Sequence, residues 1–147
     1  MNAMMVDPRV RTSPRPAGLI LFSPEVSLTL DEPSITENAG RDILPWNIPV
    51  WPYLHGRNPR DPAVSPIDAD LHDFPPAFVA FGGDEMFRDA IRRFVARLQA
   101  SGVDTTAIEE PDMFHAFPLL MPWADASERV YRAVGEFVRK RLARESA

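Results

Sequence analysis

The sequence predicts an α/β fold: a parallel sheet of three strands with helices packed beside it. Apolar runs at residues 18–24 and 77–81 are continuous rather than alternating, which is typical of strands covered on both faces. Two later segments, 87–98 and 130–142, carry apolar side chains at helical spacing. The order strand, connection, strand, helix, strand, helix favours parallel pairing through right-handed crossovers.

The first strand is expected in the run Gly18-Leu19-Ile20-Leu21-Phe22, which Ser23-Pro24 ends. A long connection follows over residues 25–76, where short helices are expected within 34–40 and 45–56. Most of the 16 prolines lie before Gly18 and between Pro45 and Pro76, so these parts are predicted to be irregular. Residues 1–16 are expected to form a disordered leader, which leaves 17–147 as the structured region.

The second half of the chain predicts two further strands and two helices. The second strand, 77–81, is broken by Gly82-Gly83, and Asp84 is expected to cap the next helix. That helix should end at Ser101-Gly102. The third strand, 104–110, is more polar, which predicts a position near the sheet edge. The last helix is marked by apolar residues at Val130, Val134, Phe137, Val138 and Leu142.

Composition excludes several classes of function. A length of 147 residues with 45% hydrophobic residues fits one domain with its own core. The net charge of -5 argues against a nucleic-acid partner. Without cysteine the chain has no disulfide or thiolate metal site, which fits a cytoplasmic protein. No apolar stretch approaches the roughly 20 residues of a membrane span.

An acid pair and a histidine follow two neighbouring strands. Asp84 and Glu85 come after the second strand, and His115 comes after the third. Functional groups of parallel sheets gather beyond the carboxyl ends of the strands, and acid before histidine is one order found in Ser-His-acid triads. Spacing alone also fits a surface acid that caps a helix and a histidine in an aromatic loop.

Four landmarks in order carry a resemblance to a known family. From Pro16 onward the chain resembles the C-terminal half of the hormone-sensitive-lipase-like esterases, which have the α/β-hydrolase fold. The matching segments are Gly18-Leu19-Ile20-Leu21-Phe22-Ser23-Pro24, the D-P-x-x-S-P segment Asp61-Pro62-Ala63-Val64-Ser65-Pro66, Phe74-Pro75-Pro76-Ala77, and the histidine motif Met113-Phe114-His115-Ala116-Phe117. Ala116 stands where the family usually has glycine.

The resemblance implies a partial α/β-hydrolase fold that comprises the last three parallel strands and their helices. It implies a carboxylesterase acting on short acyl esters, with His115 as the catalytic base and no metal or organic cofactor. The register of the helix after Arg88 places Glu85 at the family's acid position, with Asp84 as the alternative. It also implies a substrate pocket lined by aromatic residues, whose alternative role is core packing. These are Trp46, Trp51, Tyr53 and Phe117.

The family's H-G-G-G oxyanion segment and its G-x-S-x-G nucleophile elbow do not occur in these 147 residues. Three hypotheses follow. Another polypeptide completes the site, or the chain is a non-catalytic interaction or oligomerisation module, or a different serine replaces the nucleophile. The candidate serines are Ser23, Ser27, Ser34, Ser65, Ser101 and Ser127. We also expect a homo-oligomer that forms through an open edge of the first strand.

Overall fold

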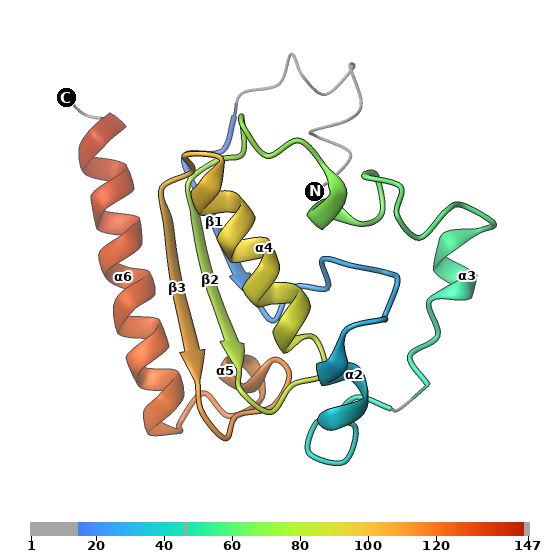
Figure 1. Cartoon of the computed structure of the whole chain (residues 1–147). Coiled ribbons are helices and arrows are strands. Elements are labelled where there is room, and N and C mark those ends of the chain that lie inside the picture. Colours follow the sequence, from blue (N-terminus) through green and yellow to red (C-terminus); the bar gives the residue numbers. More distant parts are fainter. Residues whose placement is uncertain (1–14, 46, 146–147) are drawn as a thin grey trace.

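The computed structural model of the protein describes residues 15–45 and 47–145. The predicted leader therefore lies almost entirely outside the described residues. Three parallel strands form one sheet in the order β1-β2-β3 (Figure 1). The strands are β1 (Leu19–Phe22), β2 (Ala77–Gly82) and β3 (Thr105–Glu110). The helices are α2 (Pro33–Glu37), α3 (Trp51–Leu54), the 3-10 turn η1 (Pro66–Asp68), α4 (Arg88–Ala100), α5 (Phe117–Leu120) and α6 (Asp125–Glu145).

The predicted fold class is confirmed, and so is the order of the elements. Ala77 of the central strand pairs with Leu19 on one side and Thr105 on the other. Every residue of β2 is buried, as its continuous apolar run predicted. β3 is more polar than the other two strands and forms one edge of the sheet, as predicted.

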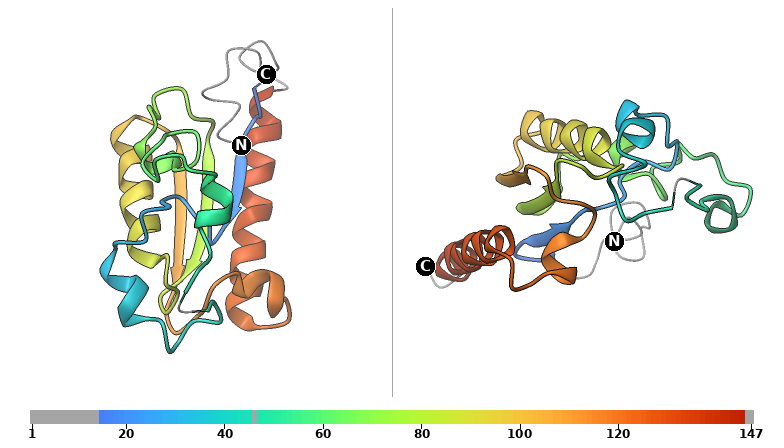
Figure 2. Two further views of the ribbon diagram at one scale, coloured as in Figure 1. Left: turned by 90° about the vertical axis from the view of Figure 1, so that its right-hand side faces the viewer. Right: turned by 90° about the horizontal axis from the view of Figure 1, so that it is seen from below.

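Helices cover the two faces of the sheet, α4 on one side and α6 on the other (Figure 2). Alternate residues of β2 point to opposite faces because the side-chain period of a strand is two. Val79 and Phe81 join the core beneath α4, together with Phe94. Phe78 lies on the other face, where its ring is 5.9 Å from that of Phe137 on α6.

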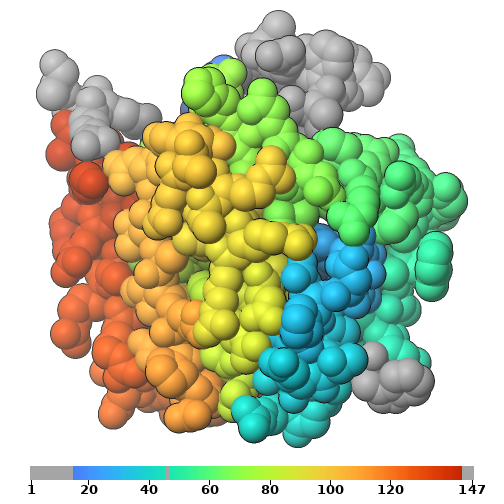
Figure 3. Space-filling view, viewed as in Figure 1, coloured from blue at the N-terminus to red at the C-terminus, as the bar shows by residue number. Residues whose placement is uncertain are grey.

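The long connection between β1 and β2 packs beside α4 over the same face of the molecule (Figure 3). It carries α3 within the predicted segment 45–56, and α2, which begins one residue before the predicted segment 34–40. A small core of its own, made by Leu28, Val50, Leu54 and Val64, holds it together. Within the described ranges, no helix has both the length and the apolar character needed to cross a membrane.

One local prediction is wrong. Asp84 does not cap α4, because the N-cap position of that helix belongs to Phe87, whose own side chain makes no capping hydrogen bond. Three more residues separate the Gly-Gly break from the helix than the capping hypothesis required. Those residues form a loop, which leaves the two acids free for other contacts.

Candidate active site

Two loops form the candidate site. The acid loop, residues 83–87, follows β2, and the histidine loop, residues 111–116, follows β3; the two loops lie against each other. A β-carbon on Gly82 would lie only 2.0 Å from the carbonyl oxygen of Met113. The backbone N–H of Gly83 donates to the carbonyl of Glu110 at 2.8 Å, and that of Asp84 donates to Met113 at 2.9 Å. Glycine at position 82 therefore allows the two loops to meet backbone to backbone.

Glu85 is fully buried in this loop. Its Oε2 atom accepts hydrogen bonds from the Ser23 hydroxyl at 2.6 Å and from the backbone N–H of Gly82 at 2.9 Å. Its Oε1 atom is buried without a partner among the described residues. Burial raises the pKa of Glu85 to about 7, although both hydrogen bonds act in the opposite direction.

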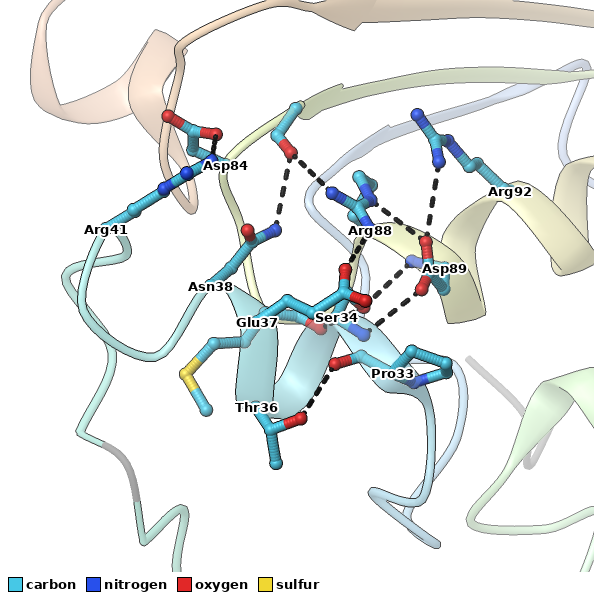
Figure 4. A network of polar contacts seen from close by, with 12 residues as sticks. Pro33, Ser34, Thr36, Glu37, Asn38, Arg41, Asp84, Arg88, Asp89 and Arg92 are labelled. Carbon is cyan, nitrogen blue, oxygen red and sulfur yellow. Dashed lines mark hydrogen bonds and ion pairs between the residues drawn. The ribbon is translucent and has the colours of Figure 1, made fainter.

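Asp84 faces a different environment. Its carboxylate forms an ion pair with Arg41 at 3.3 Å, and its side chain is partly exposed. Figure 4 shows this pair at the end of the segment that follows α2. The same segment holds the acid loop through Asn38, whose side-chain amide donates to the carbonyl of Glu85 at 2.9 Å. Asp84 therefore takes part in docking the connection onto the loop.

Polar contacts between α2 and the start of α4 strengthen this docking (Figure 4). The Ser34 hydroxyl accepts from the backbone N–H of Asp89 at 3.1 Å, and the Asp89 carboxylate accepts from that of Ser34 at 3.1 Å. Arg88 adds an ion pair with Glu37 at 3.0 Å. The acid loop is thus fixed from the connection on one side and from the histidine loop on the other.

His115 lies in the loop that follows β3. Its ring packs against the Phe87 ring in a T-shaped arrangement, with 5.4 Å between the ring centroids. The Nδ1 atom of the ring is buried without a hydrogen-bond partner among the described residues. Burial lowers the pKa of His115, which favours the neutral imidazole that a general base requires.

The residue after the histidine has a left-handed backbone. Ala116 has φ 56° and ψ 26°, a conformation that glycine adopts more readily than alanine. This explains why glycine is usual at this point of the histidine motif. In this chain a hydrogen bond from the backbone N–H of Ala116 to the Ser23 hydroxyl, at 2.8 Å, helps to hold the turn.

Ser23 joins the two loops, a role that the sequence analysis missed. It is buried at the end of β1, donates to Glu85 and accepts from Ala116. The only signal in the sequence is a serine at a strand's carboxyl end, which is where functional groups of parallel sheets gather. The Ser23 hydroxyl already donates one hydrogen bond and accepts another, and neither partner is a histidine ring. Ser23 therefore lacks the contacts of an activated nucleophile.

Glu85 and His115 therefore lie on adjoining loops with one unpaired buried atom each. Those atoms, Oε1 and Nδ1, are the acceptor and the ring nitrogen that a carboxylate–histidine pair would join. Buried polar atoms without partners are costly, and these two lie on loops that contact each other.

The three predicted substrate-binding aromatics that the structure describes do not form one cluster. Trp46 lies outside the described residues. Trp51 and Tyr53 on α3 are 74% and 66% exposed, and Phe117 is fully buried in the core beside α6. Tyr53 lines a pocket of about 340 Å³ together with Leu21 and other apolar residues, but none of Glu85, Asp84 and His115 lines it. The substrate-binding role of all four residues stays a prediction.

Known proteins resemble this chain over most of its length. Residues 1–119 match the model of a family described by the alpha/beta hydrolase fold. The chain belongs to the α/β-hydrolase fold family. An acetyl-hydrolase of Streptomyces hygroscopicus is 30% identical over 131 residues, which are 86% of this chain and 44% of that protein. An esterase of Acinetobacter venetianus is 29% identical over 142 residues, 92% of this chain and 47% of that protein.

Solved structures of the same family superpose closely. The esterase EstE5, soaked with p-nitrophenyl butyrate, gives a TM-score of 0.84 at 31% identity over 96% of this chain and 49% of its own. The hormone-sensitive-lipase homologue EstE7 from a metagenome library gives 0.85 at 28% identity over 95% of this chain and 50% of its own. The resemblance to hormone-sensitive-lipase-like esterases is thus confirmed, and the chain spans about half the length of these α/β hydrolases.

Proposed function

We infer that this chain supplies the histidine and the acid of a Ser-His-acid carboxylic ester hydrolase. The observation that carries the proposal is the buried, unpaired Oε1 of Glu85 on the loop next to the buried, unpaired Nδ1 of His115. The similarity to esterases supports the reaction class. Glu85 is preferred over Asp84 as the acid because the carboxylate of Asp84 pairs with Arg41.

In this mechanism a serine on a nucleophile elbow outside these 147 residues attacks the carbonyl carbon of a short acyl ester. His115 takes the serine proton and later gives it to the leaving alcohol. Glu85, when ionised, accepts a hydrogen bond from Nδ1, which fixes the tautomer and stabilises the imidazolium. Backbone amides of the complementing segment hold the oxyanion. No step calls for a metal, and the described residues contain no group of three or more His, Cys, Asp or Glu placed to hold one.

We expect the 147-residue chain alone to hydrolyse p-nitrophenyl butyrate no faster than free imidazole does. Neither a nucleophile elbow nor an oxyanion segment occurs in its sequence, and a histidine and acid alone retain little of the catalysis of a triad. The rate is measured at increasing substrate concentration, with a serine-directed phosphonate as probe. Saturable turnover together with phosphonate labelling of a serine would show that one of the chain's own serines is the nucleophile.

The positive test adds the N-terminal half of a related esterase, with its nucleophile elbow, by co-expression. Saturable hydrolysis is expected for the complex, with a loss of about 10³-fold or more for His115→Ala. Phe114→Ala is the matched control, since it alters the same loop but leaves the base. A complex that forms but stays inactive would refute the proposed function.

A second candidate function, an oligomerisation module, is favoured by the free edge of β1. Among the described residues no strand pairs with β1 on the side away from β2. Ile20, in the middle of this strand, is 42% exposed, and no proline interrupts residues 19–22. Unpaired strand edges of this kind pair with other chains. Two-fold dimers are the commonest closed assembly, so we propose antiparallel pairing of two copies of β1.

Light scattering on dilute protein tests the dimer. The expected mass is about twice the 16.5 kDa of the chain. Ile20→Lys places a charge on the edge strand and is expected to shift the protein towards monomer, whereas Leu119→Lys, at a more exposed position on α5, is not. A wild-type chain that stays at 16.5 kDa at all concentrations would contradict the dimer.

A further inference from the structure

The carboxylate of Asp42, in the connection, contacts both loops of the candidate site. Its Oδ1 atom accepts hydrogen bonds from the backbone N–H groups of His115 at 2.9 Å and of Ile43 at 2.7 Å. Its Oδ2 atom accepts from the backbone N–H of Met86 at 2.7 Å. Met86 directly follows Glu85. A single side chain therefore contacts the histidine itself and the neighbour of the acid.

The segment that carries Asp42 is itself fixed to the acid loop. The backbone N–H of Asp42 donates to the carbonyl of Asn38 at 2.9 Å. The side-chain amide of Asn38 donates in turn to the carbonyls of Glu85, at 2.9 Å, and of Gly83, at 3.3 Å. Asp42 extends this anchor to the histidine loop, so the connection, the acid loop and the histidine loop meet at one carboxylate.

A simpler role for Asp42 is to stabilise its own turn through Ile43. Two features favour the wider role. Two of its three hydrogen bonds go to residues 44 and 73 positions away in the sequence. Its partners in the described part of the chain are all backbone N–H groups, while the neighbouring Arg41 is paired with Asp84. A carboxylate surrounded by amide donors is held in place by them and holds them in turn.

The charge of Asp42 also acts on both functional groups. It opposes the effect of burial on His115 by raising the pKa of the ring, and it adds to the effect of burial on Glu85. Other charged groups on or beside these loops are Glu85 itself, the Arg41–Asp84 pair, Asp112 in the histidine loop, and Glu109, which also raises the pKa of Glu85. A fixed anion near the ring favours the imidazolium that forms when a histidine takes up a proton.

We propose that Asp42 is a positioning residue that holds the histidine loop and the acid loop at the separation a Glu85–His115 pair requires. The inference rests on the proposed function and deepens it, because it names the group that keeps the two members in register. A misplacement of about 1 Å of a catalytic group lowers the catalytic rate by about 10²-fold. A positioning residue such as Asp42 therefore affects catalysis without contacting the substrate.

Nuclear magnetic resonance on the full chain tests this without any substrate. Amide hydrogen exchange is measured at Met86 and His115, with Val79 in the buried central strand as the reference for global opening. The His115 ring is followed by its pH titration and by its nuclear Overhauser contact with the Phe87 ring. These two ring signals report the position of the histidine. If Asp42 only stabilised its own turn, its replacement would leave both signals unchanged.

Three variants separate position from charge. Asp42→Asn removes the charge and turns an acceptor into a donor facing an N–H group. It should speed exchange at both amides by about tenfold or more relative to Val79, weaken the Phe87 contact and lower the pKa of His115. Asp42→Glu keeps the charge but displaces the carboxylate, and should speed exchange similarly. Asp112→Asn removes a charge from an exposed side chain of the histidine loop, and should leave both amides within about threefold of wild type.

The proposal is overturned if Asp42→Asn speeds exchange at Ile43 alone, or if the His115 titration and its Phe87 contact match those of wild type. If Asp42→Asn does not fold, Asp42→Glu takes its place in the exchange and contact measurements, and the same two results would overturn the proposal. Neither measurement involves ester hydrolysis, so a negative result here would not refute the proposed function. Equally, an inactive complemented enzyme would not refute the positioning role of Asp42.

Discussion

Replacing Gly82 with alanine is expected to destabilise the protein by about 3 kcal/mol or more, or to abolish soluble folding. The added β-carbon would lie 2.0 Å from the carbonyl oxygen and 2.5 Å from the carbonyl carbon of Met113. Both atoms belong to backbone, which cannot rotate away as a flexible side chain can. The histidine loop would have to separate from the acid loop. Urea unfolding followed by circular dichroism measures the loss.

Gly40→Ala provides the matched control. A β-carbon there meets nothing within 4 Å, and the backbone is not in the left-handed region. The variant is expected within about 0.5 kcal/mol of wild type, or slightly more stable, because alanine restricts the unfolded chain. A Gly82→Ala protein as stable as Gly40→Ala would show that the two loops are not tightly packed at this point.

The sheet and its covering helices could be predicted from sequence because their signals are local. Continuous apolar runs marked β1 and β2, and helical spacing marked α4 and α6. The polar character of β3 placed it at an edge. These patterns follow from burial on one or two faces of an element, so they survive without knowledge of what lies opposite.

The candidate site was only partly predictable. The acid pair and the histidine follow strand ends, so their meeting place was clear from topology. Which of the two acids turns inward depends on contacts with distant residues. Arg41 forms an ion pair with Asp84, whereas the Ser23 hydroxyl donates a hydrogen bond to Glu85. Ser23 and Asp42 reach the site from 62 and 73 positions away in sequence, and no local pattern reports contacts of that kind.

The environment of Glu85 combines a cost in stability with the catalytic role that we propose for this residue. Glu85 has no exposed surface, and one of its oxygens has no hydrogen-bond partner among the described residues. This environment disfavours the ionised form of the carboxyl group. A triad acid must nevertheless be ionised when it faces the imidazolium. Such conflicts between local stability and arrangement are expected where a chain carries function. The pKa of Glu85, raised to about 7, makes the conflict measurable.

Glu85→Gln is expected to stabilise the protein at pH 8 and to change its stability little at pH 4. The folded-state pKa of Glu85 is raised from 4.5 to about 7. Its favourable contribution is therefore fully present below pH 4.5 and is lost as the pH rises through 7. The difference across this range amounts to at most about 3 kcal/mol. Glutamine keeps an oxygen for the Ser23 and Gly82 hydrogen bonds and removes the buried charge.

The measurement compares urea unfolding of the variant and of wild type between pH 4 and 8. His115 acts in the opposite direction, because its folded pKa is lowered and its contribution is lost as the pH falls below 6.5. Subtracting the two curves removes that contribution and isolates Glu85. Asp84→Asn, one residue away and ion-paired with Arg41, should show no comparable gain at pH 8. Parallel curves for Glu85→Gln and wild type would mean that Glu85 is solvated rather than buried, and it would then be a poor partner for His115.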